Sequence, residues 1–213
     1  SHTFSCDTYY KPRRMNFGAL RVLNDDRVEA GKGFGIHPHK NMEIISIPLK
    51  GKLKHGDSNK NSRTITIGDI QTMSAGTGIY HSEMNGSDTE PVEFLQIWVM
   101  PEKLNTPPAY QDYDIRPFLR KNELALIVSP DGDAPAKMLQ QTWFSIGEIE
   151  AGKKNGYHMH QSHAGVYIFV IEGEVKVDDT VLSRRDGMGV YDTHSFELET
   201  LKDSHILLME VPM

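Results

Sequence analysis

The chain lacks several features that would assign it to common functional classes. Cys6 is the only cysteine in 213 residues, so no intrachain disulfide can form, and a reducing cytoplasm is the expected location. No apolar run approaches the roughly 18 residues that span a bilayer. Lysines and arginines form no run, and the formal net charge is −6. We therefore expect no membrane association and no direct binding of nucleic acid, which depends on basic contacts to phosphates.

Helical signals are also scarce. Short apolar segments separated by Gly, Asn, Asp and Pro recur throughout, and this pattern is typical of an all-β sandwich or barrel. A turn at 24–26 is expected to separate strands at 20–23 and 28–30. Gly31, Gly33 and Gly35 are expected to form a flexible entry to the strand that carries His37 and His39. Further strands are expected at 42–49, 52–55, 63–67, 70–73, 94–100, 124–129, 138–149, 165–171, 174–177, 189–191 and 206–211.

The segment 101–110 is the expected boundary between two domains, because Pro107 and Pro108 cannot continue a hydrogen-bonded ladder and stiffen a linker. The predicted domains are residues 1–106 and 107–213. Each has a length that suits a small β-barrel.

Two residue pairs in the first half have the spacing of metal ligands. His37 and His39 are two apart, as are His81 and Glu83. In a strand, side chains two apart point to one face, roughly 6.6 Å from each other. Two such strands facing each other would direct three imidazoles and one carboxylate to one point, a ligand set that suits a divalent first-row transition metal. Because an octahedral ion would keep open positions, the pattern predicts a catalytic site. The alternative is a set of surface histidines with no joint role.

A second carboxylate competes with Glu83. Glu43 shares a face with His37 and His39 by strand alternation, so the residues alone leave both carboxylates open. Lys40 is the only basic residue near these ligands, and its alternation is outward. A pocket for sugars or small acids would need an inward Arg or Lys, so a flat apolar ligand fits better.

The two halves of the chain repeat each other. His37-Pro-His39 matches His158-Met-His160, and His81-Ser82 matches His194-Ser195. Two homologous barrels in tandem are therefore predicted. His158, His160 and His194 repeat the imidazoles, but Phe196 stands at the position of Glu83. We expect the second barrel to hold no metal and its histidines to be core or hydrogen-bonded residues.

The remaining histidines and the tryptophans lack a ligand spacing. His55 and His205 are expected to be ordinary surface or core residues, and Trp98 and Trp143 to be core residues.

Longer strings resemble a known family. The segments from Gly31 to Gly51 and from Gly68 to Asn85 are similar to the two motifs of the cupin superfamily. Four strings resemble the pirin family, and above all its bacterial members with quercetin 2,3-dioxygenase activity: Phe17–Asp26, Gly33–His39, Met73–Gly78 with His81–Glu83, and Gln96–Pro101. The resemblance covers nearly the whole chain and implies a bicupin of two tandem jelly-roll β-barrels. In this family a further strand precedes the segment Ser1–Ser5, so the chain is expected to lack a native N-terminal piece.

The resemblance also implies a function. It places the metal ligands on His37, His39, His81 and Glu83, and so favours Glu83 over Glu43. Fe(II) is the expected metal, with Ni, Co, Mn, Cu or Zn as alternatives. The implied activity is O₂-dependent cleavage of a flavonol such as quercetin with release of carbon monoxide, with Glu83 as ligand and base. A second hypothesis is a pirin-type regulatory protein whose metal controls redox-sensitive binding of a protein partner without turnover.

Overall fold

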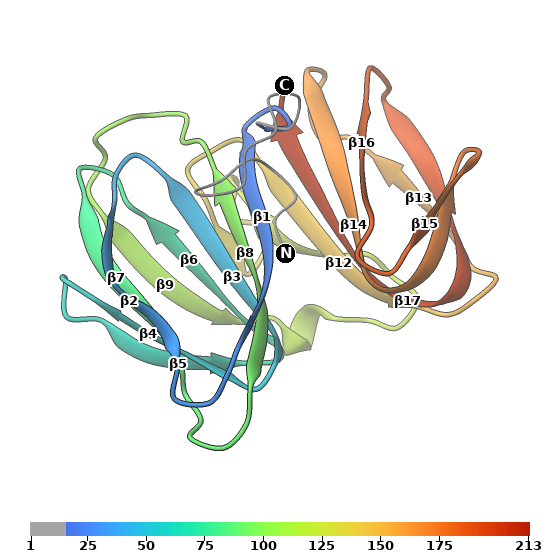
Figure 1. Ribbon diagram of the computed structural model, residues 1–213. Coiled ribbons are helices and arrows are strands. Elements are labelled where there is room, and N and C mark those ends of the chain that lie inside the picture. The colour runs from blue at the N-terminus through green and yellow to red at the C-terminus, as the bar shows by residue number, and fades with distance from the viewer. Residues whose placement is uncertain (1–15) are drawn as a thin grey trace. The chain divides into compact units, whose positions relative to one another are not determined.

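The computed structural model describes residues 16–213, so Cys6 and the segment Ser1–Ser5 lie outside the described part of the chain. The predicted all-β architecture is confirmed, because the described elements are strands apart from one short 3₁₀ helix, η1 (Arg116–Phe118) (Figure 1). Within the described residues, no helix is long and apolar enough to cross a membrane.

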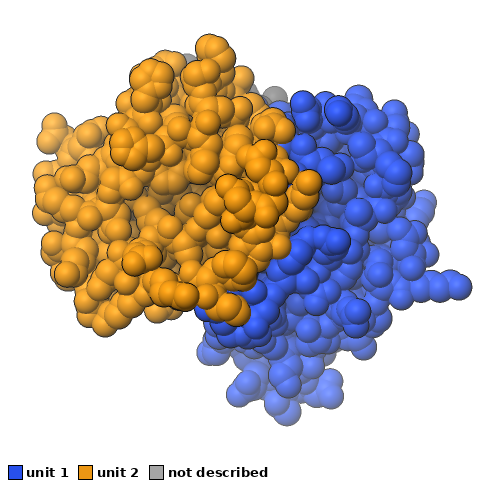
Figure 2. All heavy atoms as spheres, turned by 180° about the vertical axis from the view of Figure 1, so that it is seen from behind, with its two compact units in different colours: residues 1–116, 138–140 blue, residues 117–137, 141–213 orange. Residues whose placement is uncertain are grey.

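The first compact unit comprises residues 1–116 and 138–140 (Figure 2). Its five-stranded sheet has the order β1-β8-β3-β6-β9, and its four-stranded sheet has the order β2-β7-β4-β5. The two sheets face each other (Figure 1). Their strands are β1 (Leu20–Val28), β2 (Gly33–His39), β3 (Glu43–Lys50), β4 (Lys52–Asp57), β5 (Ser62–Thr66), β6 (Asp69–Ser74), β7 (Ile79–Asn85), β8 (Val92–Val99) and β9 (Ala109–Asp114).

Two apolar clusters fill separate levels of this unit. One contains Leu53, Ile65, Val92 and Phe94, and the other contains Ile44, Met73, Ala75 and Ile79 with Met42 and Trp98 packed against it. Along β8, Phe94 belongs to the first cluster and Trp98 to the second. Gln96 lies between them, so the level between the two clusters is polar.

The predicted turn at 24–26 is wrong, because β1 continues through it to Val28. Asn24 lies directly opposite Gln96 in the ladder with β8, and only 8 % of its surface is exposed. The long antiparallel ladder outweighs the local turn preference of Asn and Asp. The chain also forms β9 soon after Pro107 and Pro108 and pairs it with β6, so part of the expected linker is a strand.

The second compact unit comprises residues 117–137 and 141–213. Its strand order is β11-β10-β12-β17-β14-β15, with β13 paired to β17 and β16 paired to β14. The bounds are β10 (Ala125–Ser129), β11 (Ala136–Lys137), β12 (Trp143–Ile149), β13 (Lys154–His158), β14 (Ala164–Val177), β15 (Thr180–Ser183), β16 (Gly187–Tyr191) and β17 (Ser195–Pro212). The strand expected over 138–149 begins only at Trp143. The strands expected at 165–171 and 174–177 form the single strand β14, whose register shifts accommodate Gly173.

Candidate metal centre

Three histidines of the first unit converge inside the barrel. His37 on β2 lies directly opposite His81 on β7, and His39 follows two residues along β2. One ring nitrogen from each histidine lies within 4.8 Å of the other two. Among residues 16–213, no other group of three or more His, Cys, Asp or Glu side chains brings its ligand atoms this close together. The ring centroids are 4.4 to 4.9 Å apart. The period-two spacing therefore brings the three imidazoles together, because β2 and β7 are neighbours.

The distances between the ring nitrogens fit a metal ion. Two nitrogen ligands at about 2.1 Å from an ion and at right angles to each other are about 3 Å apart. Nε2 of His37 and Nε2 of His81 are 2.9 Å apart. Nε2 of His39 is buried and has no hydrogen-bond partner within residues 16–213. A buried nitrogen without a partner is costly, and a bound ion would satisfy it. The three side chains therefore fit a first-row transition metal.

A backbone contact prepares His37 for this role. Nδ1 of His37 lies 2.7 Å from the carbonyl oxygen of Gly35, so Nδ1 carries the proton and donates it. The lone pair of Nε2 is then free for a metal. Such a contact to the second ring nitrogen is the usual way in which a ligating histidine is held in one tautomer and one orientation.

The environment of the site keeps two of the imidazoles neutral. Burial, together with the nearby charge of His37, lowers the pKa of His39 to about 4. Burial, followed by the charges of His39 and His37, lowers the pKa of His81 to about 3. Neutral imidazoles are the form that binds metal, so the site is ready for an ion at neutral pH.

Glu83 lies beside these histidines and is buried on β7, with 1 % of its surface exposed. Its Oε1 accepts a hydrogen bond of 2.9 Å from the hydroxyl of Ser46, and its Oε2 accepts one from the side-chain amide of Gln96. Burial raises the pKa of Glu83 to about 7, although both hydrogen bonds oppose the rise. Glu83 is not part of the group of three nitrogens described above. Its two oxygens contact Ser46 and Gln96.

Glu43, the second candidate carboxylate, binds backbone groups of a distant segment. Its carboxylate is 2 % exposed and accepts hydrogen bonds from the hydroxyl of Ser74 at 3.0 Å and from the backbone N–H groups of Leu139 and Gln140 at 3.0 and 2.8 Å. The carboxylate therefore ties residues 138–140 to the start of β3. Like Glu83, it is not part of the group of three nitrogens.

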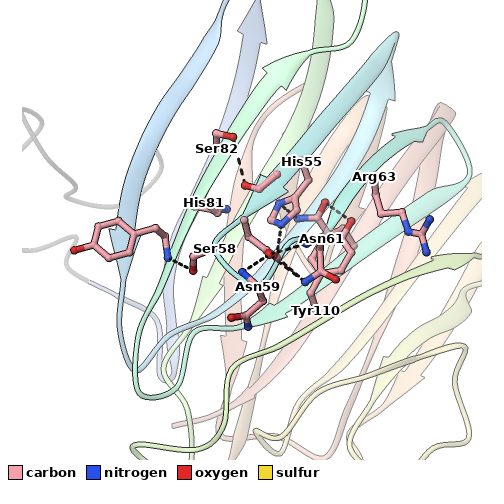
Figure 3. A network of polar contacts seen from close by, with 12 residues as sticks. His55, Ser58, Asn59, Asn61, Arg63, His81, Ser82 and Tyr110 are labelled. Atoms are coloured by element: carbon pink, nitrogen blue, oxygen red, sulfur yellow. Dashed lines mark hydrogen bonds and ion pairs between the residues drawn. The ribbon is translucent and has the colours of Figure 1, made fainter.

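His55 is a fully buried core residue on β4, opposite Glu83. The sequence analysis missed its polar contacts inside the barrel. Its Nε2 lies 2.9 Å from a carboxylate oxygen of Asp57, and its Nδ1 lies 3.3 Å from the amide nitrogen of Gln71. The ring of Tyr110 stacks on it at 4.3 Å (Figure 3). Burial lowers the pKa of His55, although Asp57 opposes this. The spacing of two between His55 and Asp57 was the signal available in the sequence.

A pocket of about 450 Å³ borders the strand that carries His81. Ile36, Ser58, Tyr80 and Ser82 contribute to its lining. Tyr80 and Ser82 point to the opposite face of β7 from His81, by strand alternation. His81 itself and Asp57 are also part of the lining, so the pocket adjoins one of the three histidines.

The histidines of the second unit are not brought together. His158 and His194 are exposed. Nδ1 of His160 lies 2.8 Å from the buried carboxylate of Glu210, and its ring stacks on Trp143. The metal-free state of this unit stays a prediction.

Comparisons with known proteins agree with this geometry. The family model described as Pirin matches residues 1–99, and the model described as quercetinase C-terminal cupin domain matches residues 126–211. The chain is 39 % identical over 211 residues to a quercetin 2,3-dioxygenase of Escherichia coli (strain K12), an alignment that covers 99 % of this chain and 90 % of that protein. This chain belongs to the pirin family.

Other members of the pirin family are similar over the same length. A pirin-like protein of Caulobacter vibrioides is 34 % identical over 220 residues, which cover 98 % of this chain and 90 % of that protein. The crystal structure of the bacterial pirin YhhW from Escherichia coli in complex with nickel(II) has a TM-score of 0.93 and 37 % identity, covering 99 % of this chain and 90 % of that one. The predicted family and its two tandem cupin domains are thus confirmed.

Proposed function

We propose that this pirin-family protein is a metal-dependent dioxygenase that cleaves a flavonol such as quercetin with O₂ and releases carbon monoxide. The observation that carries the proposal is the convergence of His37, His39 and His81 beside a buried carboxylate. Relatives named quercetin 2,3-dioxygenase support the substrate class.

In this proposal His37, His39, His81 and Glu83 hold one divalent metal ion. Fe(II) is the proposed metal, and Ni, Co, Mn, Cu and Zn accept the same ligands. A nickel(II) complex is known for YhhW. A bound ion would supply Lewis-acid polarisation of a substrate oxygen and access to O₂. The three histidines fix its position, and Glu83 completes the ligand set.

Glu83 also acts as the general base. A carboxylate next to the metal is within reach of a hydroxyl group that binds there, and it can accept that proton on one oxygen. The burial of Glu83 excludes bulk water from this transfer. The proton lost by the flavonol hydroxyl is therefore held on the carboxylate while the ring is opened.

The aromatic side chain beside the histidines suits a flat aromatic substrate. Trp98 is partly buried, packs against the apolar cluster of Ile44, Met73, Ala75 and Ile79, and contacts the ring of His39 edge-on at 4.9 Å. An aromatic neighbour of the ligands favours an aromatic substrate over a sugar or a small acid, which would need a cationic side chain.

Anaerobic reconstitution with Fe(II), Ni(II) or Mn(II) tests the proposal. Quercetin loss is then followed by absorbance after O₂ is admitted, and carbon monoxide is trapped. We expect one carbon monoxide per quercetin consumed, and loss of turnover in Glu83→Ala. The variant His158→Ala, which alters an exposed histidine of the second unit, is the matched control and should keep full activity.

Full activity of Glu83→Ala would contradict the role of Glu83. One bound metal per chain without turnover of any flavonol would instead favour the second hypothesis, a regulatory protein with a redox-sensitive protein partner. The net charge of −6 suits a protein partner better than nucleic acid. Cytoplasmic location stays a prediction under both hypotheses.

A further inference from the structure

A row of buried polar side chains crosses the inner face of the five-stranded sheet. Asn24, Gln96, Ser46 and Gln71 lie opposite one another on the neighbouring strands β1, β8, β3 and β6. None is more than 8 % exposed. Buried polar groups need hydrogen-bond partners, and apolar residues would pack at this level with less cost. Two members of the row, Ser46 and Gln96, have a partner on the opposite sheet.

Two members of the row contact Glu83, which reaches them from the opposite sheet. Ser46 donates to one carboxylate oxygen and Gln96 to the other. Both donors are side chains, so each can follow a movement of the carboxylate. They define where Glu83 lies relative to His81, two residues before it on β7.

Trp98 fixes the orientation of the Gln96 amide. The indole Nε1–H of Trp98 donates to Oε1 of Gln96 at 3.0 Å. An indole nitrogen is only a donor, so the amide oxygen of Gln96 must face Trp98 and the NH₂ group must face Glu83. Without this contact the amide could turn its oxygen toward the carboxylate, and two acceptors would then repel each other.

Trp98 also touches a second side chain of the site. Its ring meets the ring of His39 edge-on, with centroids 4.9 Å apart and an interplanar angle of 83°. One indole therefore contacts a histidine directly and a carboxylate through Gln96.

We propose that Gln96, held by Trp98, is the positioning residue that places Glu83 for the metal ion. This inference rests on the proposed ligand set, in which Glu83 is the fourth ligand. Groups that hydrogen-bond a ligating side chain typically contribute about 10- to 100-fold in metal affinity. Gln96 acts through Glu83 and does not itself touch the metal.

Anaerobic titration with Co(II), followed by its visible absorption bands, tests the proposal without relying on turnover. Gln96→Leu removes the amide at similar volume and should weaken Co(II) binding by about 10- to 100-fold. Trp98→Phe keeps an aromatic ring but removes the N–H donor, and it should weaken binding by several-fold and alter the Co(II) bands. Trp143→Phe makes the same chemical change in the second unit and should leave both readouts unchanged.

A double-mutant cycle with Glu83→Ala separates positioning from general damage to the fold. If Gln96 acts through Glu83, Gln96→Leu should have no further effect on Co(II) affinity in the Glu83→Ala background. An equal loss in both backgrounds would overturn the proposal. If Gln96→Leu does not fold, as judged by its thermal unfolding, Trp98→Phe replaces it in the same cycle.

The outcomes also separate this proposal from the proposed function. Weaker Co(II) binding in Glu83→Ala with unchanged binding in Gln96→Leu and Trp98→Phe would overturn only the positioning role. Unchanged binding in Glu83→Ala would remove Glu83 from the ligand set, and the positioning role would be overturned with it.

Discussion

The two barrels each have a facing pair of ring side chains, and they use it in opposite ways. In the first, His37 on β2 lies opposite His81 on β7. In the second, Tyr157 on β13 lies opposite Phe196 on β17, and the two rings stack at 5.4 Å inside an apolar core. The facing pair of the second barrel is thus packed in a core, whereas the facing pair of the first barrel lies together with a third imidazole. Two neighbouring strands can present ligands or close the interior, depending on the side chains that face each other.

The buried carboxylates of the two barrels differ in the kind of hydrogen-bond donors around them. Glu210 in the second barrel accepts hydrogen bonds from Tyr157, from the ring and backbone of His160, and from the backbone of Gln161. Among the described residues, the donors to Glu83 are the side chains of Ser46 and Gln96. Backbone donors cannot follow a moving carboxylate, whereas side chains can. Glu210 is therefore a fixed structural group, and Glu83 is free to exchange partners.

The largest expected effect is on metal binding. His81→Ala removes one of the three converging nitrogens and should lower metal affinity by more than the roughly 100-fold upper limit for an outer hydrogen-bond partner. Metal content after dialysis measures this. His194→Ala, its counterpart in the second half, should retain the metal content of the unmodified protein, and an equal loss there would contradict the assignment of the site to the first barrel.

The next largest effect is a loss of stability that should be confined to the second barrel. Phe196→Ala leaves a cavity beside Tyr157 and should lower the free energy of unfolding by about 3–5 kcal/mol. Urea denaturation of the metal-free protein measures this, and metal stoichiometry of the folded variant provides the control. A change in stoichiometry would show that the aromatic pair affects the first barrel as well.

A smaller effect is expected when the buried carboxylates of Glu210 and Glu83 are replaced by amides, and the two variants should differ in stability. Glu210→Gln places an amide NH₂ group among several donors and should destabilise the metal-free protein by about 1–3 kcal/mol. Glu83→Gln should cost less, because Ser46 and Gln96 can reorient. Thermal unfolding of both variants without metal tests the order. The reverse order would contradict the distinction between fixed and movable donors.

A further expected effect is a pH dependence of the metal-free first barrel. Unfolded histidine takes up its proton near pH 6.5, whereas folded His39 and His81 do so only near 4 and 3. Between these values the unfolded state binds more protons, so stability is greatest above pH 6.5 and falls as the pH drops toward 4. Burial is the main cause of both lowered pKa values. The charges of His37 and His55 lower the pKa of His81 further, and Asp57 opposes this.

Urea unfolding of Trp143→Phe, in which Trp98 is the only tryptophan, follows this barrel by fluorescence. A variant that also carries His39→Gln and His81→Gln should show a shallower loss of stability between pH 6.5 and 4. An unchanged slope would exclude the two histidines as its cause.

The sequence predicted best what depends on short-range geometry. The approach of His37, His39 and His81 follows from strand periodicity and one strand pairing. The same reasoning aligned His158 with His37, yet His158 is exposed and the neighbouring Tyr157 is buried. A shift of one residue in a strand reverses the face of every side chain, and a repeat in the letters alone does not reveal such a shift.

Contacts between distant segments could not be predicted. Glu43 shares a face with the ligand pair by alternation, but its partners are backbone groups at Leu139 and Gln140, in the other half of the chain. Gln96 and Ser46 reach Glu83 from the opposite sheet. No local pattern marks these residues, because ordinary strand positions become functional only when the barrel closes.

The tie at Glu43 has a consequence for dissecting the protein. A fragment that ended at residue 116 would contain every strand of the first barrel, but it would lack the two amides that Leu139 and Gln140 donate to a carboxylate with 2 % exposure. Only the hydroxyl of Ser74 would remain. The metal-binding barrel is thus not a self-sufficient module that could be excised at its last strand, and a minimal version must carry a short peptide from beyond residue 137.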